Sequence, residues 1–166
     1  MRSMRRLFYE IKVKTGYDIK NDVKVILCDR DEEFFSIQAK MKQKQYRFPR
    51  DLDNIRALYF TGDKCIVVSP DVRPGTSTFD MVILHECCHH LLSHEIREDD
   101  ISSIKKRISS RRIEIIEAYE SIGRRMPRSI EERMCDLFAC AICPHIQRGW
   151  SKMRRISLEM MKEVLI

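Results

Sequence analysis

An H-E-x-x-H pattern lies inside an apolar run at residues 82–92 and includes His85, Glu86 and His89. Residues four apart on an α-helix share a face, so the two imidazoles can hold one cation from the same side. Burying two histidines and a glutamate together is costly unless something pairs with them, and a metal ion provides that partner. The run therefore predicts a buried helix that carries two metal ligands.

The carboxylate of Glu86, next to the first histidine, indicates what the metal would do. A catalytic zinc ion lowers the pKa of the water bound to it to about 7. A nearby base can therefore remove a proton from that water near neutral pH. H-E-x-x-H on a helix is typical of zinc peptidases, in which the glutamate acts as the general base. We therefore expect Zn²⁺ held by His85 and His89, with Glu86 as the catalytic residue.

A catalytic zinc site needs a third protein ligand and one open position. Residues 131–144 predict a second helix on which Glu132 and Asp136 share a face, so Glu132 can bind the metal while Asp136 accepts a hydrogen bond from a ligand imidazole. Glu131 and His94 are alternative ligands, although a continuing helix puts His94 opposite His85. The start of this second helix also matches a capping box, in which Glu132 only caps the helix.

Other histidines and a tyrosine are candidates for supporting roles. On a helix, the side chain of His90 points away from the ligand pair. We therefore expect His90 at the helix surface or hydrogen-bonded behind the ligands. A further donor to the developing oxyanion is chemically expected, and His94, Tyr119 and His145 are candidates.

Seven cysteines are an odd number for a disulfide scaffold, so we expect reduced thiols. Cys140 and Cys143 form a C-x-x-C pattern, but no second pair follows it, and core packing is the favoured role. Cys87 and Cys88 flank the metal helix. They point in different directions on a helix, so one site can hardly use both.

The 166 residues are 43 % hydrophobic, which fits one compact domain spanning residues 1–166. No apolar run reaches the length of a transmembrane helix or a signal core, so we expect a cytoplasmic protein without a membrane partner.

The net charge of +6 comes from 31 basic and 25 acidic residues. Basic residues are frequent at 105–128, but only Tyr119 is near them for base stacking. Direct nucleic-acid binding is therefore the minor interpretation, and steering of an acidic partner is an alternative.

The remaining pattern predicts an α+β fold with a small antiparallel sheet packed against helices. The expected elements are a first helix from Met4 to about Thr15, strands at 23–27, 55–60 and 65–69, a turn at 61–64, two helical pieces between the motifs and a final helix at 150–164. Thr76, Ser77 or Thr78 can cap the active helix. The stretch 32–50 is ambiguous, partly helical and ended by Pro49.

Both motifs together resemble the ImmA/IrrE-type metallopeptidases, a gluzincin-like group found in phages, mobile elements and bacteria. The matching stretches are residues 85–92 and 132–139, closing at Pro144, and residues 55–69 are similar to the strand pair that precedes the active helix in that family. The resemblance implies a zincin-like core, zinc held by His85, His89 and Glu132, and Glu86 as the base. It also implies a protein substrate, a helix-turn-helix transcriptional repressor. The alternative hypothesis is a non-catalytic regulator whose structural metal site supports binding of a protein or nucleic acid.

Overall fold

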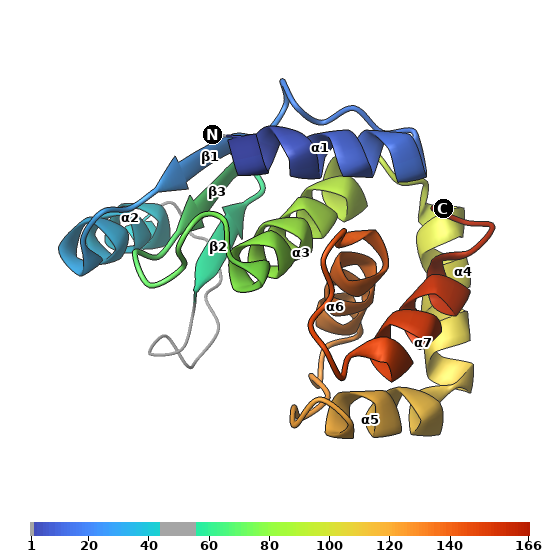
Figure 1. Ribbon diagram of the computed structural model, residues 1–166. Coiled ribbons are helices and arrows are strands. Elements are labelled where there is room, and N and C mark those ends of the chain that lie inside the picture. Colours follow the sequence, from blue (N-terminus) through green and yellow to red (C-terminus); the bar gives the residue numbers. More distant parts are fainter. Residues whose placement is uncertain (1, 44–55) are drawn as a thin grey trace.

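The computed structural model describes residues 2–43 and 56–166 of the chain. Their elements are, in chain order, α1 (Arg2–Thr15), β1 (Lys24–Leu27), α2 (Asp31–Gln43), β2 (Ala57–Phe60), β3 (Cys65–Val68), α3 (Ser77–His94), α4 (Glu98–Ser110), α5 (Arg112–Glu120), α6 (Ile130–Ile142) and α7 (Ser151–Met161). The sheet and α2 lie at one end of the molecule and α4 to α7 at the other, with α3 between them (Figure 1).

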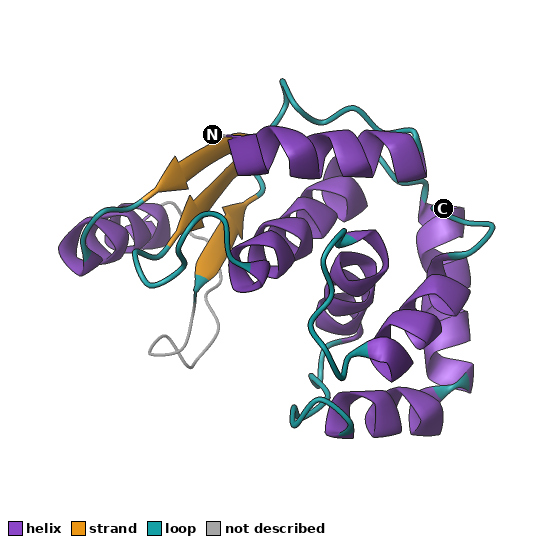
Figure 2. Cartoon of the chain, viewed as in Figure 1, coloured by secondary structure: helices purple, strands orange, loops and turns teal. Residues whose placement is uncertain are grey.

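The three strands form one sheet in the order β1-β3-β2 (Figure 2). β2 and β3 are antiparallel, with Tyr59 opposite Ile66, as the turn at 61–64 predicted. β1 instead runs parallel to β3, with Lys24 opposite Cys65, so the expectation of an all-antiparallel sheet is wrong. Parallel neighbours need a long connection, and the chain between β1 and β3 provides one that includes α2 and β2.

β3 is buried on both faces of the sheet because helices cover both sides. Ile66 and Val68 belong to the large core formed with α1 and α3. Cys65 and Val67 belong to a smaller cluster that includes Phe34 of α2. This division follows the two-residue period of a strand, and it fixes the sheet against α3.

α3 is the central helix, since β2, α1 and α6 all pack against it. Its first turn is capped by Thr76, whose side chain accepts a hydrogen bond from the backbone N–H of Phe79, and Ile83, Leu84 and Leu91 are fully buried along its length. The Ser129 side chain caps α6 in the same way, by accepting from the N–H of Glu132. The two motif helices therefore begin at fixed residues and meet side by side.

The α+β class, the first helix, the hairpin, the two helical pieces between the motifs and the final helix are confirmed. Part of the ambiguous stretch is helix α2, which ends at Gln43; residues 44–50 and Ile55, where a strand was expected to begin, lie outside the described residues. Within the described ranges, the helices are too short or too polar to cross a membrane.

Candidate metal centre

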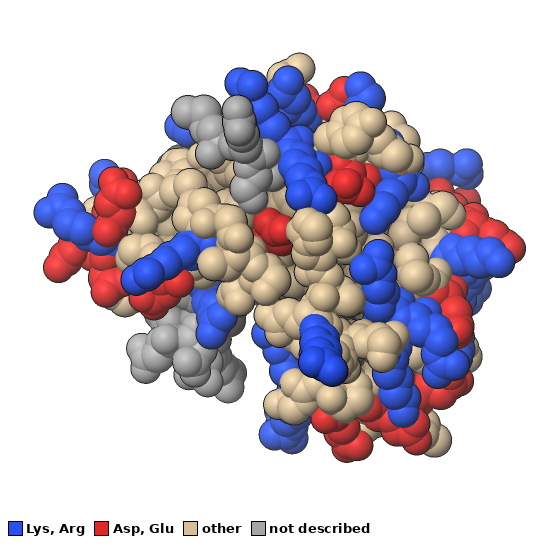
Figure 3. Space-filling view, in the orientation of Figure 1, with Lys and Arg blue, Asp and Glu red and all other residues tan. Residues whose placement is uncertain are grey.

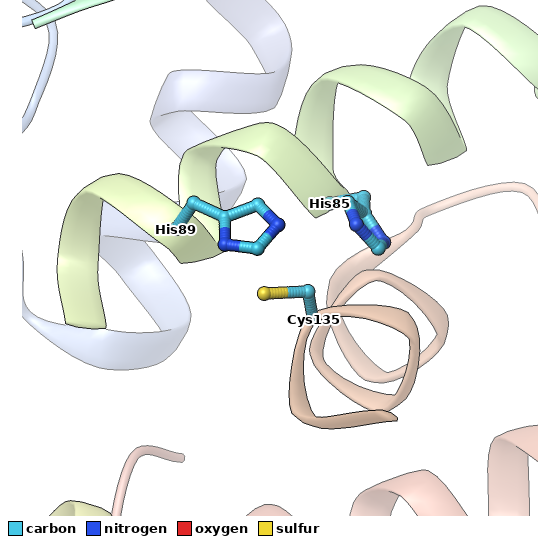
Figure 4. A group of neighbouring side chains, drawn as sticks. All are labelled: His85, His89 and Cys135. Atoms are coloured by element: carbon cyan, nitrogen blue, oxygen red, sulfur yellow. The ribbon is translucent and has the colours of Figure 1, made fainter. Parts of the chain in front are cut away.

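Three possible metal donors come together where α3 meets α6. His85 and His89 lie on successive turns of α3, and Cys135 of α6 faces them (Figure 4). One ligand atom from each residue lies within 4.8 Å of the others, so this group could hold a metal ion. Cys135 was not predicted from the sequence. It is three residues after Glu132 and therefore on nearly the same helix face, and this spacing could have revealed it.

Glu132 lies between the two imidazoles. Its Oε2 is 3.2 Å from Nε2 of His85, and its Oε1 is 3.4 Å from Nε2 of His89. Ligands bound tetrahedrally at about 2.0–2.1 Å from one zinc ion stand about 3.3–3.4 Å apart. Each of the two nitrogen–oxygen distances, which involve different oxygens of Glu132, is therefore close to an edge of a tetrahedral zinc site, and oxygen and imidazole nitrogen are donors that zinc accepts.

Each imidazole also contacts a carboxylate through Nδ1, on the side of the ring away from Glu132. Nδ1 of His85 donates a hydrogen bond of 2.9 Å to Oδ1 of Asp136, and Nδ1 of His89 donates one of 2.8 Å to Oε1 of Glu131. These bonds place the proton of each neutral ring on Nδ1 and leave Nε2 free to bind an ion. Asp136 thus accepts a hydrogen bond from one of the two imidazoles, that of His85, while Glu131, considered above as a ligand, contacts the far side of His89 instead.

Tyr119 of α5 supports this arrangement from behind. Its buried hydroxyl donates a hydrogen bond of 2.7 Å to Oδ2 of Asp136. The carboxylate is therefore held by two partners and has little freedom to turn away from His85. A hydroxyl engaged in this way is directed at Asp136 and is a poor candidate for an oxyanion donor.

The negative charge around the imidazoles shifts their pKa values. Burial alone would lower the pKa of His89, but hydrogen bonds to Glu131 and Glu132 outweigh it and raise the pKa to about 10. The pKa of His85 is also raised, because Asp136 and Glu132 outweigh its burial. The site thus attracts positive charge, which either protons or a divalent cation can supply.

Glu86 is buried beside the histidines, with 9 % of its surface exposed. Burial raises its pKa, against the opposing effects of His85 and His89 and a hydrogen bond from the backbone of Tyr59. A carboxyl group with a raised pKa is a stronger base than one in water. The contact with β2 also fixes the carboxylate relative to the sheet.

A cleft of about 730 Å³ opens over these residues. Residues 56–59 and Thr61 line one side of the cleft. His85, Glu86 and His89 of α3 line its floor. Residues of α6 and Trp150, next to α7, line the opposite side. Pockets that bind small molecules have volumes of about 300–1,000 Å³, so several residues of a peptide can enter. His94, Tyr119 and His145, the candidates for an oxyanion donor, do not line this cleft.

His90 is fully buried, so the expectation that it lies at the helix surface is wrong. Its Nδ1 is 2.9 Å from the hydroxyl oxygen of Tyr59, and burial lowers its pKa to about 4. His90 is buried because β2 packs on α3 and covers a side of the helix that an isolated amphipathic helix would expose to solvent. His94, at the end of α3, contacts the carbonyl oxygen of Thr61 at 3.2 Å.

All seven cysteines are buried free thiols. Cys140 and Cys143 belong to the large core, which agrees with a packing role for this C-x-x-C pair. Cys87 and Cys88 lie within α3 and are not among the three possible donors.

The comparisons with known proteins found no matching family model, and no significant similarity to a curated protein or to a solved structure.

Proposed function

We propose that this chain is a zinc-dependent endopeptidase. The observation that carries the proposal is the position of Glu132, whose two carboxylate oxygens lie 3.2 and 3.4 Å from Nε2 of His85 and of His89. Zinc sites with two histidines and one glutamate are found in metallopeptidases, where the remaining position stays open. The cleft beside Glu86 leaves room for a substrate at that position.

Zinc bound by His85, His89 and Glu132 would supply positive charge that acidifies water and polarises the scissile carbonyl. Glu86 takes the proton from the attacking water as the oxygen bonds to the carbonyl carbon, and passes that proton to the amide nitrogen as the C–N bond breaks. Asp136 and Glu131 keep the two imidazoles in orientation throughout, because their hydrogen bonds are to Nδ1 and leave Nε2 unaffected.

The proposed substrate is a protein, a helix-turn-helix transcriptional repressor, on the basis of the resemblance to ImmA/IrrE-type peptidases. We also propose that the protein works in the cytoplasm. The seven buried free thiols support a reducing compartment.

Replacement of the base tests the assignment. Glu86→Gln keeps the size of the side chain and removes its basicity, so the variant should retain zinc and lose cleavage by about 10²–10⁴-fold. Zinc is measured by elemental analysis, and cleavage by mass spectrometry of a repressor encoded beside this protein. Glu98→Gln, at the exposed start of α4, is the matched control. Undiminished cleavage by Glu86→Gln would reject the role of Glu86.

Cys135 favours a second candidate function, a non-catalytic regulator with a structural metal site. If the Cys135 thiolate joined His85, His89 and Glu132, four protein ligands would close the site. Cobalt substitution separates the two functions, since a cobalt–thiolate bond gives an intense near-ultraviolet band. The peptidase is expected to show the same spectrum in wild type and Cys135→Ser, whereas a closed site would lose the band in the variant.

A further inference from the structure

A second hollow, of about 650 Å³, lies between α5 and the start of α6. Its lining is strongly basic and contains the arginines Arg112, Arg124, Arg125, Arg128 and Arg133. The only carboxylate among the residues that line it is Glu120. On the face shown in Figure 3, basic side chains gather over the part of the molecule where the loop between α5 and α6 lies in Figure 1. We call this hollow the basic pocket.

The arginines of the basic pocket have no acidic partner within the described residues: none of the ion pairs formed there includes any of them. Arg133 has a structural role, because its guanidinium donates to the carbonyl oxygens of Pro127 and Arg128 and so holds the loop. The others leave their donors facing the hollow or the solvent. A concave surface lined by one sign of charge focuses the electrostatic potential and attracts ions of the opposite sign.

The basic pocket adjoins the cleft of the candidate metal centre, because Arg124 lines both. Its guanidinium carbon lies 5.1 Å from the centre of the Trp150 ring, which fixes the side chain at the boundary. The cleft itself is lined by four carboxylates, Glu86, Glu131, Glu132 and Asp136, and also by Arg56 and Arg124. A chain that extends from the cleft past Arg124 therefore reaches a surface where positive charge predominates.

We propose that the basic pocket binds an acidic segment of the polypeptide substrate and thereby sets which part of that substrate lies over the cleft. This inference rests on the proposed peptidase function. A polypeptide is favoured over a nucleic acid because the lining contains no aromatic ring on which bases could stack. Ile116, Met126 and Pro127 also line the pocket and can contact the aliphatic parts of peptide side chains.

Peptide binding tests the proposal independently of cleavage. The probe is a short dye-labelled peptide of alternating glutamate and serine, compared with the same peptide carrying glutamine in place of glutamate, and with an oligothymidylate of equal charge. The Arg112→Gln/Arg125→Gln/Arg128→Gln variant removes three exposed guanidiniums and spares Arg124 and Arg133. The control is Arg5→Gln/Arg6→Gln/Arg30→Gln, which lowers the net charge equally at exposed positions outside the pocket.

Fluorescence anisotropy should show that the glutamate peptide binds the pocket variant about tenfold more weakly than wild type, since each exposed charge pair contributes modestly. The control variant should bind within about twofold of wild type, and the glutamine peptide should not distinguish the proteins. Equal binding by wild type and pocket variant, an equal loss in the control variant, or tighter binding of the oligothymidylate than of the peptide would each overturn the proposal.

A failure of the inference about the basic pocket can be distinguished from a failure of the proposed peptidase function. In this assay the pocket variant, the control variant and the protein they are compared with all carry Glu86→Gln as well, so hydrolysis of the probe does not affect the result. If the acidic segment does not bind while zinc-dependent cleavage persists, only the inference about the basic pocket fails. Melting temperatures of the variants confirm that each one folds.

Discussion

Nδ1 of His85 donates a hydrogen bond of 2.9 Å to Asp136, and Tyr119 donates one of 2.7 Å to the other oxygen of the same carboxylate. This pair holds the imidazole with Nε2 directed at Glu132. The amide of Asp136→Asn can no longer serve as a charged acceptor for both donors, so zinc affinity is expected to fall about 10–100-fold. Competition with a fluorescent zinc chelator measures the change. Asp99→Asn, at an exposed site on α4, should leave the affinity unchanged, and an unaltered Asp136→Asn protein would contradict the role of this contact.

Metal removal should lower the thermal stability. An ion that binds only the folded chain, present at about 100 times its dissociation constant, stabilises that state by about 2.7 kcal/mol. For a chain of this size the melting temperature should rise by about 5–10 °C on addition of zinc and fall again with a chelator. Differential scanning calorimetry checks this expectation. His89→Ala should not respond to zinc, and an equal response in that variant would place the ion elsewhere.

Two isoleucines of α5 offer a matched test of the core. Ile115 is fully buried, whereas 74 % of the surface of Ile113 is exposed. Ile115→Ala removes apolar contacts and leaves a cavity, so it should lower the free energy of unfolding by about 2–5 kcal/mol. Ile113→Ala should change it by about 0.5 kcal/mol or less. Urea unfolding followed by circular dichroism measures both, and similar losses would show that α5 packs differently.

The buried thiols should resist alkylation until the pH is high. Burial raises the pKa of Cys28 to about 11 and that of Cys140 to about 12, so both stay protonated and unreactive in the folded chain at pH 8. In the unfolded chain a thiol ionises near pH 8.5. Because the unfolded state then loses these protons first, the free energy of unfolding should fall as the pH rises from about 8.5 to 11.

Mass spectrometry after brief iodoacetamide treatment measures the reactivity of the thiols. The native protein at pH 8 should remain almost unmodified, and the same protein in guanidinium chloride should be modified at all seven cysteines. Rapid native modification of Cys28 or Cys140 would show that the thiol is accessible.

The sequence predicted the parts of the site that depend on helical spacing. His85 and His89, and likewise Glu132 and Asp136, are four residues apart, and that spacing alone puts each pair on one helix face. A hydrogen bond from one of the ligand imidazoles to Asp136 was predicted from the face that Asp136 shares with Glu132, and the structure shows that the imidazole is that of His85. The roles of zinc, of Glu86 as a base and of Glu132 as a ligand stay predictions.

The features that sequence reasoning missed depend on how elements meet in space. β1 is parallel to β3 because of the path of the chain through α2 and β2, which no local pattern specifies. His90 is buried because β2 covers α3. The contact of Glu131 with His89 likewise depends on how α6 is rotated about its own axis where it packs on α3. A different rotation would give Glu131 a different neighbour.

The two sides of the site are far apart in the chain: Asp136 comes 51 positions after His85, and Glu131 comes 42 positions after His89. They meet only when α6 has packed on α3. During synthesis the ribosome therefore releases the histidines long before their carboxylate neighbours, and a nascent chain has no complete cage for an ion. The complete group that could hold a metal ion therefore forms only after residues 131–136 have been synthesised and have folded onto α3.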